Sequence, residues 1–219
     1  MLSMGDGFPI LKPNAKTVLL TAVLGIIWAG AIAAGLRVLL NYETSPGGVG
    51  VVPNSWPANS SIALAKDRPT LVMVAHPQCP CTRASMSELA QVVARVQNKA
   101  RVYVLFYTPS AIGPQWDNTN LRREAAEIPG VTVLSDRDGV EARRFGAETS
   151  GHTFLFAADG RLLFSGGITA SRGHSGDNAG EIAIVSLINN RVSERARTVV
   201  FGCALGNRDK QGKAAPCLR

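Results

Sequence analysis

The sequence predicts an α/β domain with a mixed sheet covered by helices on both faces, preceded by one long apolar helix. Three observations support this fold class. An uncharged apolar run lies near the start of the chain, short β-rich runs then alternate with helical stripes, and two more β-rich runs flank a tight turn. Alternating strands and helices build parallel pairs, whereas a hairpin adds antiparallel ones. Of the 219 residues, 46% are hydrophobic and 18% are charged, which excludes a low-complexity chain.

The apolar run, Thr17–Leu36, is long enough to cross a bilayer. At about 1.5 Å per residue, a helix of this length spans the hydrocarbon core. Apolar residues continue through Val38–Leu40, which is further than a signal peptide requires, so we predict a transmembrane anchor over residues 17–40. Small residues at Ala31–Ala33 leave a second interpretation open, in which the run is a cleaved signal peptide. Both interpretations export the domain.

Basic residues beside the run predict its orientation. Lys12 and Lys16 precede the run, and Arg37 follows it. Together with the amino terminus, the side with more positive charge stays inside, so we expect residues 1–16 in the cytoplasm. The chain is then a single-pass protein of the inner (cytoplasmic) membrane, whose soluble domain faces the periplasm or the cell exterior.

Two segments flank the predicted domain at residues 60–190. Residues 41–59 contain Gly and Pro without any regular period, which predicts a linker. Residues 191–219 hold seven Lys or Arg against two acidic residues, so most of the formal net charge of +7 lies in this segment. We predict a solvated basic tail. Because the rest of the chain is nearly neutral and has no basic stripe with aromatic residues, we expect no nucleic-acid partner.

The first half of the domain is predicted to be strand, helix and strand. Residues 69–75, PTLVMVA, form a continuous apolar run, which is typical of a strand buried on both faces. Residues 82–99 place apolar side chains at helical spacing without an internal Gly or Pro. Residues 102–107 are again rich in β-forming side chains.

The second half adds shorter elements. We predict a helix over residues 121–128, a strand over 131–134, a helix over 138–145, a hairpin of strands 153–157 and 161–164, and a last helix over 178–190. The Gly-rich loop before the last helix contains His174 and Asp177. We expect Asp177 to cap that helix, with a site role for His174 as the weaker alternative.

Cys79-Pro80-Cys81 carries the predicted chemistry because it follows a buried strand and begins a helix. Free backbone N–H groups and the positive end of the helix dipole favour a thiolate there, which lowers the pKa of the thiol. Pro80 suits the first helical position, and Arg83 adds a positive charge nearby. We therefore predict Cys79 as the nucleophile and Cys81 as the resolving cysteine. His76 is expected to be a buried residue at the end of the strand, with tuning of Cys79 as a second role.

The segment VMVAHPQCPCTRASMSELAQVV resembles the first strand, active-site turn and helix of the thioredoxin superfamily. The segment FGAETSGHTFLFAADGRLLFSGG is similar to the closing hairpin of its exported, membrane-anchored members of the TlpA, peroxiredoxin-like and Sco type, and to sequences labelled RedB. The resemblance covers about residues 60–190. It implies a thioredoxin-like sheet and a thiol-disulfide oxidoreductase that acts on protein thiols or disulfides without a cofactor.

Two departures from that pattern leave an alternative open. C-x-C spacing closes a tighter disulfide ring than C-x-x-C, and a strained disulfide is more oxidising. His152 stands where redox members of the superfamily carry a cis-proline, and in Sco proteins a copper-ligating histidine holds the corresponding place. Two thiolates and an imidazole suit the soft ion Cu(I). The alternative is thus a Sco-like copper-binding assembly factor with a site formed by Cys79, Cys81 and His152.

The remaining cysteines, Cys203 and Cys217, allow two interpretations. In an oxidising compartment they would close a short disulfide-bonded loop, worth about 3 kcal/mol on the chain-entropy model. The alternative is that Cys203 reaches Cys79-Pro80-Cys81 as a third thiol. The sequence alone does not separate the two.

Overall fold

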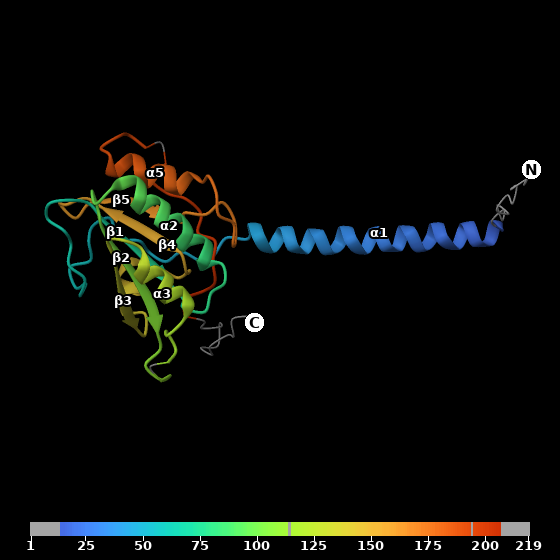
Figure 1. The fold of residues 1–219 in the computed structure, drawn as a ribbon, viewed down its shortest axis with the longest axis horizontal. Helices are drawn as coiled ribbons and strands as arrows, with labels where there is room; N and C mark the ends of the chain where they lie inside the picture. Colours follow the sequence, from blue (N-terminus) through green and yellow to red (C-terminus); the bar gives the residue numbers. More distant parts are fainter. Residues whose placement is uncertain (1–13, 114, 194, 207–219) are drawn as a thin grey trace, which may run out of the picture. The chain divides into compact units, whose positions relative to one another are not determined.

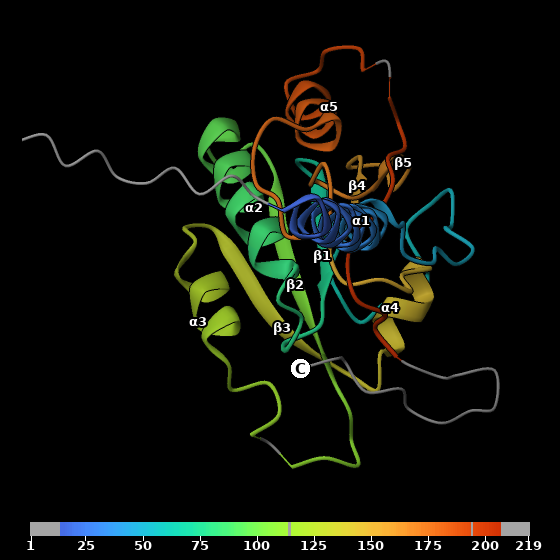
Figure 2. The ribbon, with the colours of Figure 1, turned by 90° about the vertical axis from the view of Figure 1, so that its right-hand side faces the viewer.

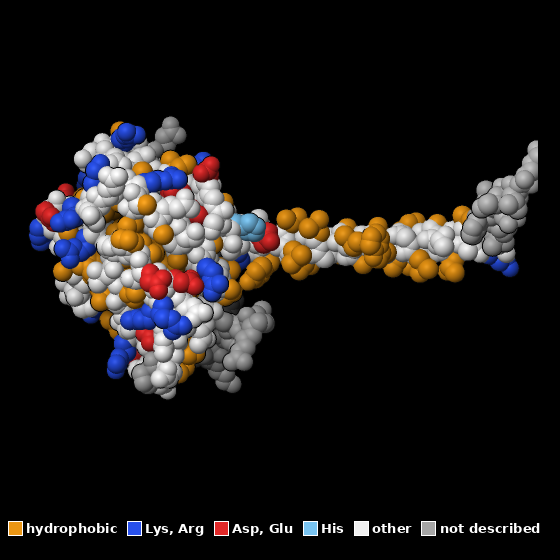
Figure 3. All heavy atoms as spheres, viewed as in Figure 1, with side chains coloured by type: hydrophobic (Ala, Val, Ile, Leu, Met, Phe, Trp, Pro, Cys, Tyr) orange, Lys and Arg blue, Asp and Glu red, His pale blue; other side chains and the backbone are white. Residues whose placement is uncertain are grey.

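The computed structural model describes residues 14–113, 115–193 and 195–206. The chain divides into two compact units, Met1–Tyr42 and Glu43–Arg219. The described part of the first unit belongs to helix α1 (Ala15–Thr44), which is long and apolar enough to cross a membrane (Figure 1). Figure 3 shows hydrophobic side chains exposed along this helix. Trp28, for example, is 69% exposed. A single N-terminal helix with such a surface fits the predicted anchor.

The second unit is built on a five-stranded mixed sheet. The strands are β1 (Thr70–Ala75), β2 (Arg101–Thr108), β3 (Val131–Arg137), β4 (His152–Phe156) and β5 (Leu162–Gly166), in the order β3-β2-β1-β4-β5. β1 and β3 each pair with β2 in parallel, whereas β4 is antiparallel to both β1 and β5. This arrangement confirms the predicted mixed sheet and is that of a thioredoxin-like fold.

Helices cover both faces of the sheet, as Figure 2 shows. The helices of this unit are α2 (Thr82–Val96), α3 (Asn120–Glu127), α4 (Val140–Phe145) and α5 (Ala179–Ile188). One core cluster joins α2, α3 and α5 to the side chains of Leu71 and Met73 on β1. The other joins α4 to Val72 and Val74. Because neighbouring β1 residues point to opposite covered faces, the whole strand is buried, which explains its uninterrupted apolar sequence.

Several element boundaries differ from the sequence predictions for local reasons. α2 ends at Val96, three residues earlier than predicted, because Gln97 and Asn98 adopt positive φ angles of 46° and 62°. The prediction that Asp177 caps the last helix, α5, is wrong. Asn178 caps α5 instead, because its side chain accepts a 2.8 Å hydrogen bond from the N–H of Glu181.

The segment predicted as a linker packs on the second unit. Gly47 donates its N–H to the carbonyl of Val200 at 2.8 Å, and Trp56 donates to the carbonyl of Gly160 at 2.7 Å. The Trp56 ring packs edge-on against Phe145 at a centroid distance of 5.1 Å. Residues 47–62 therefore belong to the folded unit. Gly and Pro here suit a chain that follows a surface without regular structure, which resembles a linker in sequence.

The described part of the predicted tail also packs on the domain. Ser165 and Gly167, at the end of β5, donate to the carbonyls of Ala196 and Val199. Val200 is 1% exposed and Leu205 is 4% exposed. The segment has a net positive charge, but these two apolar side chains dock it beside the sheet. Residues 207–219, including Cys217, lie outside the described residues.

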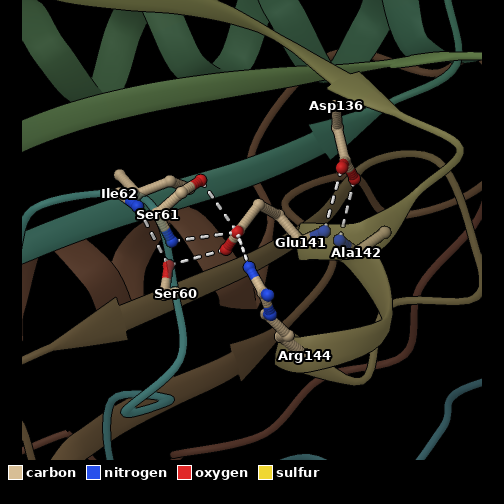
Figure 4. A network of polar contacts seen from close by, with 7 residues as sticks. All are labelled: Ser60, Ser61, Ile62, Asp136, Glu141, Ala142 and Arg144. Carbon is tan, nitrogen blue, oxygen red and sulfur yellow. Dashed lines mark hydrogen bonds and ion pairs between the residues drawn. The ribbon is translucent and has the colours of Figure 1, made fainter.

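A polar network fastens the chain just before β1 to α4 (Figure 4). The carboxylate of Glu141 accepts hydrogen bonds from the Ser60 hydroxyl at 2.6 Å and from the N–H and hydroxyl of Ser61 at 3.0 and 2.9 Å. Arg144 pairs with the same carboxylate. The carboxylate of Asp136 in turn accepts from the N–H groups of Glu141 and Ala142 at the start of α4. Glu141 thus anchors two segments far apart in sequence.

We expect Glu141→Ala to lower the free energy of unfolding of the domain by about 1–3 kcal/mol, because it removes the buried carboxylate that accepts three partly buried hydrogen bonds and pairs with Arg144. Urea denaturation followed by circular dichroism measures the change. Glu124→Ala is the matched control, since Glu124 makes only a 4.0 Å surface ion pair with Arg83, and its effect should stay within about 0.5 kcal/mol. Equal destabilisation by the two variants would contradict the role given to Glu141.

Candidate active site

Cys79, Pro80 and Cys81 lie at the junction between β1 and α2. The chain leaves β1 at Ala75, and a turn follows in which Cys79 donates its N–H to the His76 carbonyl at 3.1 Å. Cys81 is the N-cap residue of the 15-residue helix α2. The predicted placement of Cys79 beside a helix N-terminus is therefore what the structure contains, and the dipole of α2 favours negative charge there.

The structure brings a third thiol, that of Cys203, to this junction. The Cys79 and Cys203 sulfurs are 2.7 Å apart, and the sulfurs of Cys79, Cys81 and Cys203 all lie within 4.8 Å of one another. All three cysteines are free. Cys79 and Cys81 are buried, at 2% and 7% exposure, and Cys203 is partly exposed. Of the two interpretations of Cys203, the structure contains the one in which it reaches the C-P-C turn.

The segment around Cys203 is held by the loop that precedes β4. The N–H of Ser150 donates to the Cys203 carbonyl at 2.8 Å, and Thr149 forms a β-bridge with Ala204. Gly202 permits this close approach, because a Cβ atom there would lie 2.0 Å from the Ser150 carbonyl oxygen. Cys203 is thus placed by backbone contacts rather than by its own side chain.

Ser150 also contacts the C-P-C turn through its side chain. Its hydroxyl oxygen accepts from the N–H of His76 at 2.7 Å and lies 2.6 Å from the Thr82 hydroxyl oxygen. Sequence reasoning missed Ser150 and Thr82, whereas it offered the arrival of Cys203 as one of two interpretations. The only sequence signal near Ser150 was Gly151, which has a φ of 91° and indicates a turn without indicating its partner.

The three thiols are not equivalent in their acidity. The Cys203 thiol, followed by the Cys81 thiol, donates to Cys79 and lowers the pKa of Cys79 despite burial. The hydrogen bond to Cys79, followed by that to Cys81, is the main reason that the pKa of Cys203 is raised. For Cys81 the Cys203 contact lowers the pKa, but the Cys79 contact and burial outweigh it, so that the pKa is raised. One thiolate, at Cys79, with two protonated neighbours is the favoured state.

Arg83, predicted as a supporting charge, faces elsewhere. Its side chain is 68% exposed, and its ion-pair partner is Glu124 on α3 at 4.0 Å. Arg172 supplies a positive charge to the site instead, and this charge opposes part of the rise in the pKa of Cys81. Its guanidinium donates to the carbonyl of Gly202, next to Cys203. The loop that sequence analysis assigned to capping α5 therefore also contributes a charge.

The two predicted histidines of the site have different surroundings. His76 is buried beside the turn, where its Nδ1 accepts from the N–H of Gln78 at 3.2 Å. Its ring stacks on Tyr107 at a centroid distance of 6.0 Å and meets Trp116 edge-on at 5.8 Å. Burial lowers the pKa of His76, and the Cys79 charge opposes that effect. This is the expected buried residue at the end of the strand, close enough to Cys79 for a tuning role.

His152 is fully buried on β4, and the structure does not bring it into the thiol cluster. Its Nε2 lies 2.9 Å from the hydroxyl of Ser165 on β5, and its ring packs on Phe154 at 4.1 Å. Burial lowers its pKa to about 4. Among the described residues, the close group of possible metal ligands contains three cysteines and no histidine. The described residues also contain no cis peptide bond. His174, the weaker site candidate, is exposed in its loop.

No family model matches the sequence, and no curated protein matches it. The fold is similar to that of an uncharacterised conserved protein from Geobacillus kaustophilus, with a TM-score of 0.55 and 16% identity over 76% of this chain and 95% of that chain. It is also similar to a hypothetical protein from Sinorhizobium meliloti, with a TM-score of 0.52 and 17% identity over 74% and 93%. A secreted disulfide oxidoreductase from Mycobacterium tuberculosis aligns with a TM-score of 0.39 and 15% identity over 58% and 84%.

The sheet order of this chain is that of a thioredoxin-like fold, and three thiols, two of them just before α2 and one from the chain after α5, meet beside the start of α2. The first two similar structures share its fold. The chemistry of the site depends on this chain's own residues.

We expect one thiol of the reduced chain to remain ionised well below pH 8. Absorbance at 240 nm, which thiolates contribute, measures the ionisation, and Cys79→Ser should remove this absorbance. Because the pKa of Cys79 is lowered on folding, ionisation stabilises the reduced fold above the pKa of the unfolded thiol, about 8.5. That stabilisation is lost as the pH falls through the lowered value. Cys203→Ala should shift the titration upward, since it removes the first donor. An unshifted titration would contradict the assignment.

Proposed function

We propose that the protein is a membrane-anchored thiol-disulfide oxidoreductase in which Cys79 is the nucleophile. The observation that supports this most strongly is the placement of Cys79 at the N-terminus of α2, with two thiols adjacent to its sulfur. A thiolate is the form that attacks disulfides, and both surroundings stabilise a thiolate. The substrates are protein thiols or disulfides, and the reaction needs no cofactor.

The reaction proceeds through a mixed disulfide. The Cys79 thiolate attacks one sulfur of a partner disulfide, forms a new S–S bond and releases the other partner sulfur as a thiolate. A second thiol of the site then attacks Cys79, which releases the partner and leaves a disulfide in this protein. The partner gains two electrons and two protons, and two cysteines of this chain lose them. The sequence prediction assigns the second attack to Cys81.

The stabilised thiolate also favours one direction of transfer. Anything that stabilises the reduced form makes the corresponding disulfide a stronger oxidant, and 30 mV corresponds to about 1.4 kcal/mol for this two-electron couple. The donors around Cys79 stabilise the reduced form. We therefore propose that the oxidised protein accepts electrons from partner dithiols more readily than the reduced protein donates them.

For exchange with a model dithiol peptide, we expect Cys79→Ser to lower the rate at least 100-fold, because no other thiol of the site carries the charge. Stopped-flow fluorescence of a labelled peptide measures the rate. Cys217→Ser is the matched control and should exchange at the wild-type rate. An exchange rate in Cys79→Ser equal to that of the wild type would remove Cys79 as the nucleophile.

We also propose that α1 anchors the domain to the inner (cytoplasmic) membrane, with residues 1–16 inside and the domain in the periplasm or outside. The length and apolar surface of α1 support this proposal, as do Lys12 and Lys16 before it. Alkaline phosphatase fused after residue 60 should be active, and the mature protein should stay in the membrane fraction at full length. A soluble form that begins near Ala34 would instead indicate a cleaved signal peptide.

A second candidate function is Cu(I) binding by a copper-assembly factor. The observation that favours it is the cluster of three sulfurs within 4.8 Å of one another, since soft thiolates are the ligands that Cu(I) prefers. The donor set fits the ion, with Cys203 in the place that the sequence analysis gave to His152. Cys79, Cys81 and Cys203 would hold Cu(I), and the bound ion would be a cargo for transfer to another protein.

If the site carries copper, the reduced chain should bind one Cu(I) in competition with a chromogenic chelator. Cys203→Ser should weaken binding at least tenfold, about 1.4 kcal/mol, because it removes one of three ligands. His152→Ala should leave binding unchanged, since the His152 ring contacts Ser165 and Phe154. Weak binding by the wild type, or a loss confined to His152→Ala, would count against the three-thiol site.

A further inference from the structure

The Cys79 thiol has two candidate partners for a disulfide, Cys81 and Cys203, and the two differ in their position relative to Cys79. We propose that the disulfide formed during turnover joins Cys79 to Cys203, so that Cys203 is the resolving cysteine and Cys81 remains a thiol. This proposal rests on the proposed oxidoreductase function and replaces the assignment of Cys81 within it. It makes the segment after α5 a chemical part of the active site.

Contact geometry supports Cys203 as the partner. The Cys79 and Cys203 sulfurs are 2.7 Å apart. Cys81 lies two residues after Cys79 in a helical turn, in which the N–H of Thr82 bonds to the Cys79 carbonyl at 3.2 Å and Cys81 has φ −66° and ψ −28°. The Cys81 thiol lies within 4.8 Å of the Cys79 sulfur and interacts with it, but side chains at positions i and i+2 of a helical turn diverge from each other. A Cys79–Cys81 disulfide would therefore require the turn before α2 to deform.

Backbone hydrogen bonds and buried neighbouring side chains hold Cys203 in place. Its carbonyl accepts the Ser150 N–H at 2.8 Å, and Leu205 donates its N–H to the Glu148 carbonyl at 2.9 Å. Val200 and Leu205, on either side of Cys203, are buried. A disulfide to Cys79 joins two segments that the fold already holds together. Little rearrangement is needed to form it.

Proton positions also agree with this order of events. Before the first attack, the Cys203 thiol donates to the Cys79 thiolate, and this hydrogen bond keeps the pKa of Cys203 high. Once Cys79 forms the mixed disulfide, the thiolate that accepts this hydrogen bond is gone and Cys203 loses its proton more easily. The Cys203 sulfur then attacks the Cys79 sulfur, the bond from Cys79 to the partner breaks, and the partner leaves as a thiolate that takes up a proton from solvent.

Partial exposure gives Cys203 a second property that Cys81 lacks. Cys203 is the most exposed of the three cysteines. A partly exposed thiol can be reached from solvent. Cys81, at 7% exposure, lies deeper and serves as a donor that stabilises the Cys79 thiolate.

Disulfide mapping of the full-length protein tests the proposal. The reduced chain is oxidised with excess oxidised glutathione, its remaining thiols are alkylated, and tryptic peptides are analysed by mass spectrometry. We expect residues 67–83 linked to residues 198–208, with alkyl groups on Cys81 and Cys217. The same linkage should form in Cys81→Ser, which identifies Cys79 as the linked residue. A Cys79–Cys81 or Cys203–Cys217 disulfide as the main product overturns the proposal.

Trapping with glutathione gives an independent measurement. Cys203→Ser should accumulate glutathione on Cys79, with the resolution rate lowered at least 100-fold, whereas Cys81→Ser should resolve within about tenfold of the wild type. Cys217→Ser is the control. Accumulation in Cys81→Ser alone overturns the role of Cys203 but retains the oxidoreductase. Equal exchange by Cys79→Ser and the wild type rejects the oxidoreductase itself. Should Cys203→Ser fail to fold by circular dichroism, mapping in Cys81→Ser still tests the linkage.

Discussion

The arrangement of the three thiols depends on Ser150, a fully buried residue in the loop before β4. Its N–H holds the Cys203 carbonyl, and its hydroxyl oxygen accepts from His76, where the chain leaves β1. One residue thus fixes both segments that carry the sulfurs. Because β4 pairs with β1 directly, the sheet sets where Ser150 lies, and the separation of Cys79 from Cys203 follows from strand pairing.

Around Cys79, a negative charge is stabilised by neutral donors and a helix dipole rather than by an adjacent Lys or Arg. Arg83 faces Glu124, and the Arg172 guanidinium bonds to the backbone beside Cys203. Burial of the sulfur raises its pKa, and the thiol donors overcome that effect. Interactions at such short range in a dry site are screened by salt far less than surface charges are. The thiols that donate to Cys79 are also the thiols available to form a disulfide with it. The acidity of Cys79 and the redox chemistry of the site are therefore linked.

Most of the fold was predictable from the sequence because its signals are local. The buried strand β1, the amphipathic helix α2 and the hairpin β4–β5 each have a period or turn that residues near in sequence create. The misses involve segments whose structure comes from long-range contacts. Residues 47–62 and 195–206 have no period of their own, and backbone hydrogen bonds to distant strands dock them on the domain. We predicted a linker and a tail from their amino-acid composition. A segment rich in polar residues and Gly has the same composition whether it packs on the domain or not.

The sequence by itself determined that a Cys-Pro-Cys turn joins a buried strand to a helix, and hence predicted a lowered pKa for Cys79. It also determined that an apolar helix precedes the domain. Only the tertiary structure decided that Cys203 completes the site and that His152 packs between Phe154 and Ser165. The reason is that a helix N-terminus is created by neighbours in the chain. The meeting of Cys79 and Cys203, by contrast, depends on the pairing of β1 with β4 and on the docking of the chain after α5, which no local pattern encodes.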